Sequence, residues 1–197
     1  ETGVGAVATQ SLVKVEYGPD GLDRMHNGQS AQEALNEMLS ADKAKALRQV
    51  AIIDSKGNVA VHTGDKCIQA AGHKVGKNYS VQANMMEKTT VWNAMADAYD
   101  DSKGDLAERM MSALEAAEKE GGDIRGKQSA SMLIVSGNPT GTAWKDKVLD
   151  LRVDDHHKPL EELRRLIRIH RAYRHAKQGD HFLEKDKIDE AMREYQK

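Results

Sequence analysis

The chain has 197 residues, of which 39% are hydrophobic and 30% charged, a balance typical of a folded globular protein. Its formal net charge of -2 provides no overall attraction to nucleic acid or to an anionic membrane surface, and no apolar run approaches the roughly 18 residues that a membrane span requires. The single cysteine, Cys67, excludes an internal disulfide and any site with several cysteine ligands. We therefore expect neither a nucleic-acid partner nor a membrane span.

Strands are predicted wherever short apolar runs lie between turn residues. The chain opens with a small-residue strand and then a turn at residues 17–21. A hairpin is predicted around Ser55-Lys56-Gly57, and a Gly-rich loop at residues 71–76. The six predicted strands cover residues 4–8, 51–54, 59–62, 80–83, 132–135 and 148–152.

Helices are predicted outside these strands. Ser30 and Glu33 have the spacing of a capping box and open the first helix. Further helices are predicted at residues 90–101, 105–120 and 159–177, and Gly179-Asp180 is expected to break the chain before two short helices. Because helices segregate from strands instead of alternating with them, we predict an α+β fold. Residues 1–158 would form the main domain and residues 159–197 a helical appendage.

No metal site or cofactor is predicted. The histidines do not converge at the i, i+4 spacing that a helical two-His site prefers. Gly3 and Gly5 lack the rest of a dinucleotide fingerprint, and no phosphate-cradling loop is present. We expect a protein without metal or cofactor.

Thr2 is a candidate nucleophile. It precedes the small-residue run Gly3 to Ala8, and autoprocessed amidases present a catalytic Thr at the start of such a strand. A Thr nucleophile needs a base, and its own free α-amine can serve because its pKa lies near neutrality. The alternative is an ordinary buried strand, and Glu1 blocks the amine of Thr2.

Polar residues that interrupt strand-like or Gly-rich segments form a second group. An amide at a strand end can donate to an oxyanion, and a nearby His can orient a substrate. We therefore predict Asn84 as a second catalytic candidate. The predicted substrate-binding residues, expected to include several that line one cleft, are Thr9, Gln10, His62, His73 and Gln82. The alternative is that each of them satisfies backbone groups in loops.

Ordered motifs across about 150 residues resemble a widespread bacterial and archaeal family, domain of unknown function 1028. They are GVGAVATQS (3–11), YGPDGL (17–22), RQVAIIDSKGNVAVHTG (48–64), AGHKVGKNYSVQANMM (71–86), GGDIRGKQSASMLIV (121–135) and LDLRVDDH (149–156). The resemblance implies a four-layer αββα sandwich similar to N-terminal-nucleophile (Ntn) hydrolases. Family members carry an upstream strand hairpin that is missing here, and the nucleophile could lie on it.

The resemblance makes a hydrolase of amide bonds, acting on a small-molecule or peptide-like substrate, the leading hypothesis for function. One alternative is a non-catalytic ligand-binding protein on the same fold. The other is an oligomeric interaction protein that associates through its C-terminal helices. Fold-level analogy alone does not decide between these functions.

The C-terminal helices are expected to mediate association. Residues 171–197 resemble one tetratricopeptide-type helix pair in the spacing of Gly179, Phe182, Ala191 and Tyr195. A single such pair cannot bury its own apolar face. We expect that face to be covered by the domain or, preferably, by a second copy in a homo-oligomer. The basic positions 164, 168, 171 and 175 lie on one helix face, interpreted as solvated or as a docking surface.

The chain begins at Glu1 in a strand-like segment. We interpret this start as the loss of upstream sequence by processing, design or proteolysis. Two compartments therefore remain open: the cytoplasm or, if a signal peptide has been removed, the periplasm or the exterior.

Overall fold

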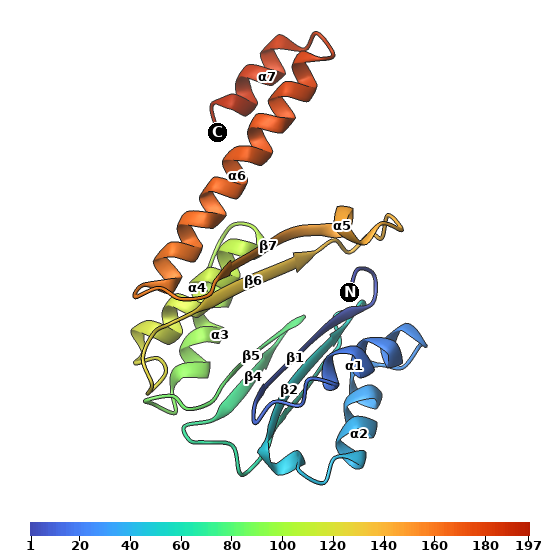
Figure 1. Ribbon diagram of the computed structural model, residues 1–197, viewed down its shortest axis with the longest axis vertical. Coiled ribbons are helices and arrows are strands. Elements are labelled where there is room, and N and C mark those ends of the chain that lie inside the picture. Colours follow the sequence, from blue (N-terminus) through green and yellow to red (C-terminus); the bar gives the residue numbers. More distant parts are fainter. The chain divides into compact units, whose positions relative to one another are not determined.

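Seven helices and three small sheets make up the protein, whose computed structural model describes residues 1–197 (Figure 1). The α+β class predicted from the sequence is confirmed. The chain divides into two compact units, one comprising Glu1–Gly126 with Val135–Val148 and the other Lys127–Ile134 with Leu149–Lys197. None of the helices combines the length and the apolarity needed to cross a bilayer.

The first sheet is antiparallel, in the order β1 (Gly5–Ser11), β2 (Arg48–Asp54) and β3 (Val59–Thr63). Side chains alternate between the two faces of a sheet. Val50 and Ile52 of β2 lie on one face and are buried in an apolar core. Gln49 therefore lies on the opposite face, where it is fully buried.

Helices α1 (Tyr17–His26) and α2 (Ala31–Ala41) cover the apolar face of this sheet (Figure 1). The predicted capping box is confirmed, since the Glu33 backbone N–H donates to Ser30 Oγ (3.3 Å) and the Ser30 N–H donates to Glu33 Oε2 (2.8 Å). The turn predicted at residues 17–21 is wrong. A helix forms there because Tyr17, Gly21 and Met25 recur every four residues and are all buried.

A second antiparallel pair, β4 (Gly72–Gly76) and β5 (Tyr79–Ala83), packs against α3 (Val91–Asp101), which in turn packs on α4 (Leu106–Lys119). Strand β4 was missed in the sequence, where its glycines indicated a loop. Each glycine instead makes room for an aromatic ring. A Cβ on Gly72 would lie 2.5 Å from the Trp92 ring, and a Cβ on Gly76 would lie 2.0 Å from the Tyr79 ring.

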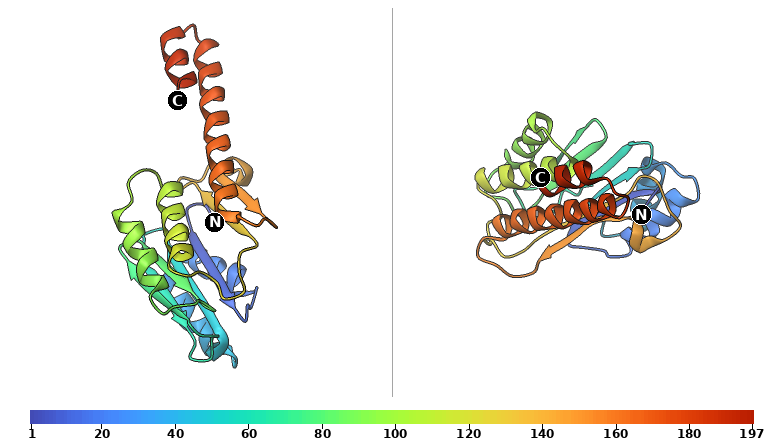
Figure 2. Two further views of the ribbon diagram at one scale, coloured as in Figure 1. Left: turned by 90° about the vertical axis from the view of Figure 1, so that its left-hand side faces the viewer. Right: turned by 90° about the horizontal axis from the view of Figure 1, so that it is seen from above.

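The rest of the chain comprises β6 (Ala130–Val135), α5 (Ala143–Asp146), β7 (Lys147–Val153), α6 (Pro159–Leu183) and α7 (Ile188–Tyr195). Helices α6 and α7 lie side by side in both views of Figure 2. The break predicted at Gly179-Asp180 is wrong, because α6 continues through both residues. The ring of Tyr195 covers Gly179, and its hydroxyl donates to Asp180 Oδ1 at 2.5 Å.

A buried polar cluster fixes the end of β1. Arg48 Nε donates to Asp42 Oδ2 (2.8 Å), and Arg48 Nη1 donates to the carbonyl of Leu12 just beyond β1 (2.6 Å). The hydrogen bond from Arg48 lowers the pKa of Asp42 to about 2. Burial, reinforced by the Asp42 carboxylate, raises the pKa of Tyr17 to about 12. Asp42 is thus ionised and Tyr17 neutral across the physiological range.

Two glycines of α1 provide a test of how closely this helix packs on β1. A Cβ on Gly21 would lie 2.9 Å from Val7 Cγ2, whereas a Cβ on Gly18 meets nothing within 4 Å. We expect Gly21→Ala to lower the free energy of unfolding by about 1–3 kcal/mol through overpacking. Gly18→Ala should be neutral or stabilising by up to about 1 kcal/mol, since it gains helix propensity without a clash. Urea titrations of both variants measure the difference, and equal effects would contradict the close approach.

Candidate functional site

The candidate site is built around the buried amide of Gln49. Its Nε2 donates to the backbone carbonyls of Gly72 (3.0 Å) and Ala83 (2.9 Å), so a side chain of β2 connects to both β4 and β5. Its Oε1 accepts from Gln10 Nε2 (2.7 Å) and Asn84 Nδ2 (3.1 Å). Four segments that are distant in sequence therefore meet at one side chain.

Strand register explains why these residues meet. Gln10 pairs with Gln49 across β1 and β2, and Gln49 pairs with Thr63 across β2 and β3. Directly paired residues project from the same face of a sheet. Gln82, which pairs with His73 in the second sheet, donates to Gln10 Oε1 over a longer 3.4 Å.

Thr63 and His73 extend the network away from Gln49. Gln49 Nε2 lies 2.9 Å from Thr63 Oγ1, which is 2.8 Å from His73 Nδ1. Burial, and to a lesser degree the nearby His62, lowers the pKa of His73. A neutral His73 can accept a hydrogen bond from the Thr63 hydroxyl, which completes the chain of donors and acceptors.

A cavity of about 390 Å³ adjoins this network. We call it the amide cleft, because amide side chains form its polar wall. Apolar side chains, including three methionines, form much of the rest. The lining residues are Gln10, Ser11, Gln82, Ala83, Asn84, Met85, Met86, Met95, Leu114, Ala117, Asp123 and Arg125.

Two lining residues adopt a left-handed backbone conformation that residues other than glycine rarely take. Ser11 has a φ of 68° and Met85 a φ of 58°. Met85 is held by two backbone hydrogen bonds, one from its N–H to Ile68 and one from Ile124 to its carbonyl, both 3.0 Å long. Strained residues of this kind concentrate at functional sites.

The charged groups of the amide cleft neutralise each other. Arg125 donates to both carboxylate oxygens of Asp123, from Nε at 2.9 Å and from Nη2 at 2.6 Å. The hydrogen bonds from Arg125 lower the pKa of Asp123. A carboxylate held in this way is a poor general base.

The structure brings together only some of the residues predicted for the site. Gln10, Gln82 and Asn84 line the amide cleft, and His73 joins the network behind it. Thr9 and His62 do not, because both pair with Val50 and so face α1 and α2 with it. His62 Nε2 lies 2.8 Å from the Lys45 carbonyl, and Thr9 Oγ1 is buried without a partner.

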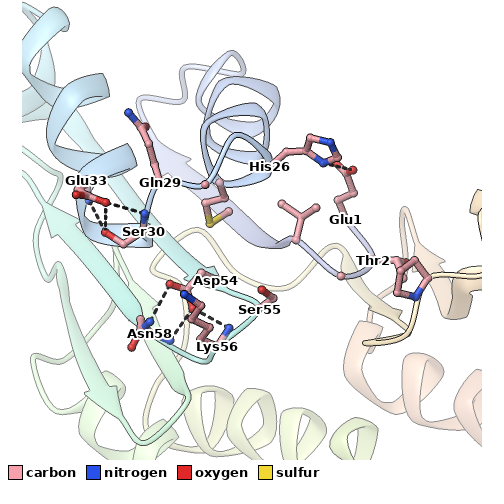
Figure 3. A pocket seen from close by; sticks show the side chains of 15 residues that line it. Glu1, Thr2, His26, Gln29, Ser30, Glu33, Asp54, Ser55, Lys56 and Asn58 are labelled. Atoms are coloured by element: carbon pink, nitrogen blue, oxygen red, sulfur yellow. Dashed lines mark hydrogen bonds and ion pairs between the residues drawn. The ribbon is translucent and has the colours of Figure 1, made fainter.

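Thr2 lies apart from Asn84. It lines a different pocket, shown in Figure 3, with Glu1, His26 and Asp54 among its neighbours. A strand rises about 3.4 Å per residue, so Gln10 lies roughly 17 Å along β1 from Gly5. Thr2 comes before Gly5 in the chain, at the opposite end of β1 from Gln10. Thr2 and Asn84 therefore line different pockets. The backbone amine that Thr2 would need as a base is taken up in its peptide bond with Glu1.

Ser11, Met85 and Arg125 are among the cleft residues that the sequence did not indicate. The left-handed conformations of the first two cannot be seen in a sequence pattern. Gln49 was also missed, although a single Gln beside the apolar run Val50 to Ile53 could have indicated it. Across the structure, no group of three or more His, Cys, Asp or Glu side chains is placed to hold a metal ion.

An α+β protein with small antiparallel sheets and a cleft lined by amide and apolar side chains is the class that the fold and site define. Residues 1–163 match the family of unknown function DUF1028, and the chain belongs to that family. The crystal structure of protein SPO2555 from Silicibacter pomeroyi, of the same family, is similar to this chain. It has a TM-score of 0.75 and 28% sequence identity over 84% of this chain and 70% of the other. No curated protein matches the sequence.

The carbonyl partners of Gln49 make its charge state testable. In Gln49→Glu, an ionised carboxylate would face the Gly72 and Ala83 carbonyls that now accept from an N–H group. This repulsion raises the folded-state pKa above the unfolded value of about 4.3, so the penalty grows as the pH rises through this range. We expect a loss of about 3 kcal/mol in unfolding free energy at neutral pH and a smaller loss near pH 4.

Urea titrations at the two pH values measure this change. Gln32→Glu, on the exposed surface of α2, is the matched control and should be close to neutral at both. A Gln49→Glu protein as stable as the control would show that the amide does not connect the sheets.

Proposed function

We propose that the amide cleft binds a small molecule that carries a polar, amide-like group. The observation that carries this proposal is a network of amides at one side of a cavity. Gln10 and Asn84 both donate to the fully buried Gln49, and Gln82 donates to Gln10. A hydrogen-bonded network of buried amides holds its members in fixed orientations. Side chains fixed before binding recognise a ligand with little further loss of conformational entropy.

The other walls of the amide cleft favour a ligand with an apolar body. Met85, Met86 and Met95 line them together with Leu114. Methionine side chains are flexible and polarisable, so they adapt to ligands of different shape. A few placed polar groups within an apolar surround are typical of small-molecule sites.

Filling the amide cleft tests the binding proposal. Ala117 of α4 lines the cleft, whereas the neighbouring Ala116 does not. We expect a panel of small amides to shift the backbone NMR signals of Ser11 and residues 83–86. Ala117→Phe should abolish these shifts by occupying the cavity, while Ala116→Phe keeps them. Retained shifts in a folded Ala117→Phe protein would place binding elsewhere.

Hydrolysis of an amide bond is the second candidate function. It is favoured by the order of the layers, with α1 and α2, two sheets, and α3 and α4 in succession, as in the αββα sandwich of Ntn hydrolases. This is an argument from fold, which is weaker than one from a site. Ser11 provides the one aliphatic hydroxyl of the amide cleft, and the paired Asp123 offers little basicity. Binding is therefore the better supported function.

Substitution of the hydroxyl residues tests the hydrolase proposal. If the wild-type protein turns over a chromogenic amide, Ser11→Ala should lower kcat/KM by at least about 100-fold. Thr2→Ala should leave the value unchanged, because Thr2 lines the other pocket. The reverse pattern would move catalysis to Thr2. If no amide in the panel is turned over, ligand binding is the function that is still supported.

We also propose that α6 and α7 mediate self-association, as a helical appendage spanning residues 159–197 that ends in a tetratricopeptide-like pair. Tyr173, Ile188 and Met192 are 75%, 64% and 51% exposed, which is unusual for large apolar side chains on neighbouring helices. Exposed apolar patches of this kind mark interaction sites. A helix pair of a repeat family needs a further layer to cover its apolar face.

Charge substitutions on α7 test this association. Ile188→Glu combined with Met192→Glu should lower the particle mass in light scattering to that of a monomer, because two carboxylates cannot be buried in an apolar interface. The matched control is Gln178→Glu with Gln196→Glu, which adds the same charge at exposed polar positions. A wild-type monomer, or an oligomer unaffected by the α7 substitutions, would contradict the proposal.

A further inference from the structure

The backbone carbonyls at one end of the Gln49 network determine the direction of its hydrogen bonds. Backbone carbonyls only accept hydrogen bonds, so the Gln49 side-chain atom that faces Gly72 and Ala83 must be its nitrogen. The flipped amide would place an oxygen against two carbonyl oxygens. The Gln49 amide oxygen therefore faces Gln10 and Asn84, and both must present N–H groups to it.

This orientation passes from residue to residue toward the cavity. With its nitrogen on Gln49, Gln10 turns its oxygen to Gln82, whose nitrogen donates to it at 3.4 Å. The relay ends at Gln82 Oε1, which is buried and has no hydrogen-bond partner, although Gln82 lines the amide cleft. The amide nitrogens of Gln10, Gln82 and Asn84 each have one acceptor within the network, whereas the relay supplies no donor for the Gln82 oxygen.

A buried acceptor without a donor is unfavourable unless something supplies one. An isosteric carboxylate cannot supply a hydrogen to Gln82 Oε1, but an amide or amidine nitrogen can. The ion pair of Asp123 with Arg125 also leaves no free cation in the amide cleft to attract a carboxylate. Its methionine walls accommodate an apolar substituent on the ligand.

We infer that the amide cleft prefers ligands that present an N–H group, such as a carboxamide or amidine on an apolar body, over the corresponding carboxylates. This inference rests on the proposed binding function and specifies its ligand class. It also changes the role expected for Asn84. Its amide nitrogen donates to Gln49, so it helps to set the polarity of the site.

Benzamide, benzamidine and benzoate form a matched set of probes that differ in the group they present. We expect NMR titrations of the wild-type protein to give dissociation constants at least about tenfold lower for benzamide and benzamidine than for benzoate. Gln82→Met, which removes the unpaired oxygen at similar size, should reduce this preference to less than about threefold. Thr9→Val is the matched control, since it removes another buried oxygen without a partner, on the opposite face of β1.

The outcomes separate the ligand class from the binding function. Benzoate binding in the amide cleft as tightly as benzamide would overturn the inference and leave the binding function intact. A folded Gln82→Met protein with an undiminished preference would also overturn it. If none of the three probes binds, the result contradicts both the ligand class and the binding function. The wild-type comparison decides the matter even if Gln82→Met does not fold.

Discussion

The arrangement of the two sheets around the site depends on the hydrogen bonds that the Gln49 amide makes between them. Gln49 is fully buried, and a buried amide without hydrogen-bond partners would be strongly unfavourable. By donating to Gly72 and Ala83, it satisfies carbonyls of β4 and β5 from the side of β2. The network thus holds the sheets together and orients the side chains of the amide cleft with the same bonds.

Local patterns predicted much of the fold. The capping box at Ser30, the hairpin at residues 55–57 and the helices at residues 90–101 and 105–120 depend on neighbouring residues, and each is present in the structure. The errors share another cause. β4 was taken for a loop and Gly179 for a helix break, because glycines suggest irregular backbone. In the structure these glycines instead make room for the rings of Trp92, Tyr79 and Tyr195. Tertiary packing overrode local propensity at both places.

The candidate site could also be predicted in part, because some of its residues follow a local pattern. Polar residues at the ends of apolar strands indicated Gln10, Gln82 and Asn84, all of which line the amide cleft. Thr9 and His62 followed the same rule but lie on the other face, and the two-residue period of a strand could have separated Thr9 from Gln10. Whether Gln49 meets Gly72 and Ala83 depends on contacts between sheets, which no local pattern encodes.

The backbone conformation at Ser11 and Met85 has a consequence for stability. Each left-handed residue without glycine's freedom is disfavoured by about 1 kcal/mol or more, and both occur in the wall of one cavity. Glycine at either position would adopt the same conformation without this strain. That exchange would remove a hydroxyl and a thioether from the cavity and loosen two segments that its shape requires. At these two positions the chain thus carries backbone strain in a wall of the cavity, where glycine would carry none.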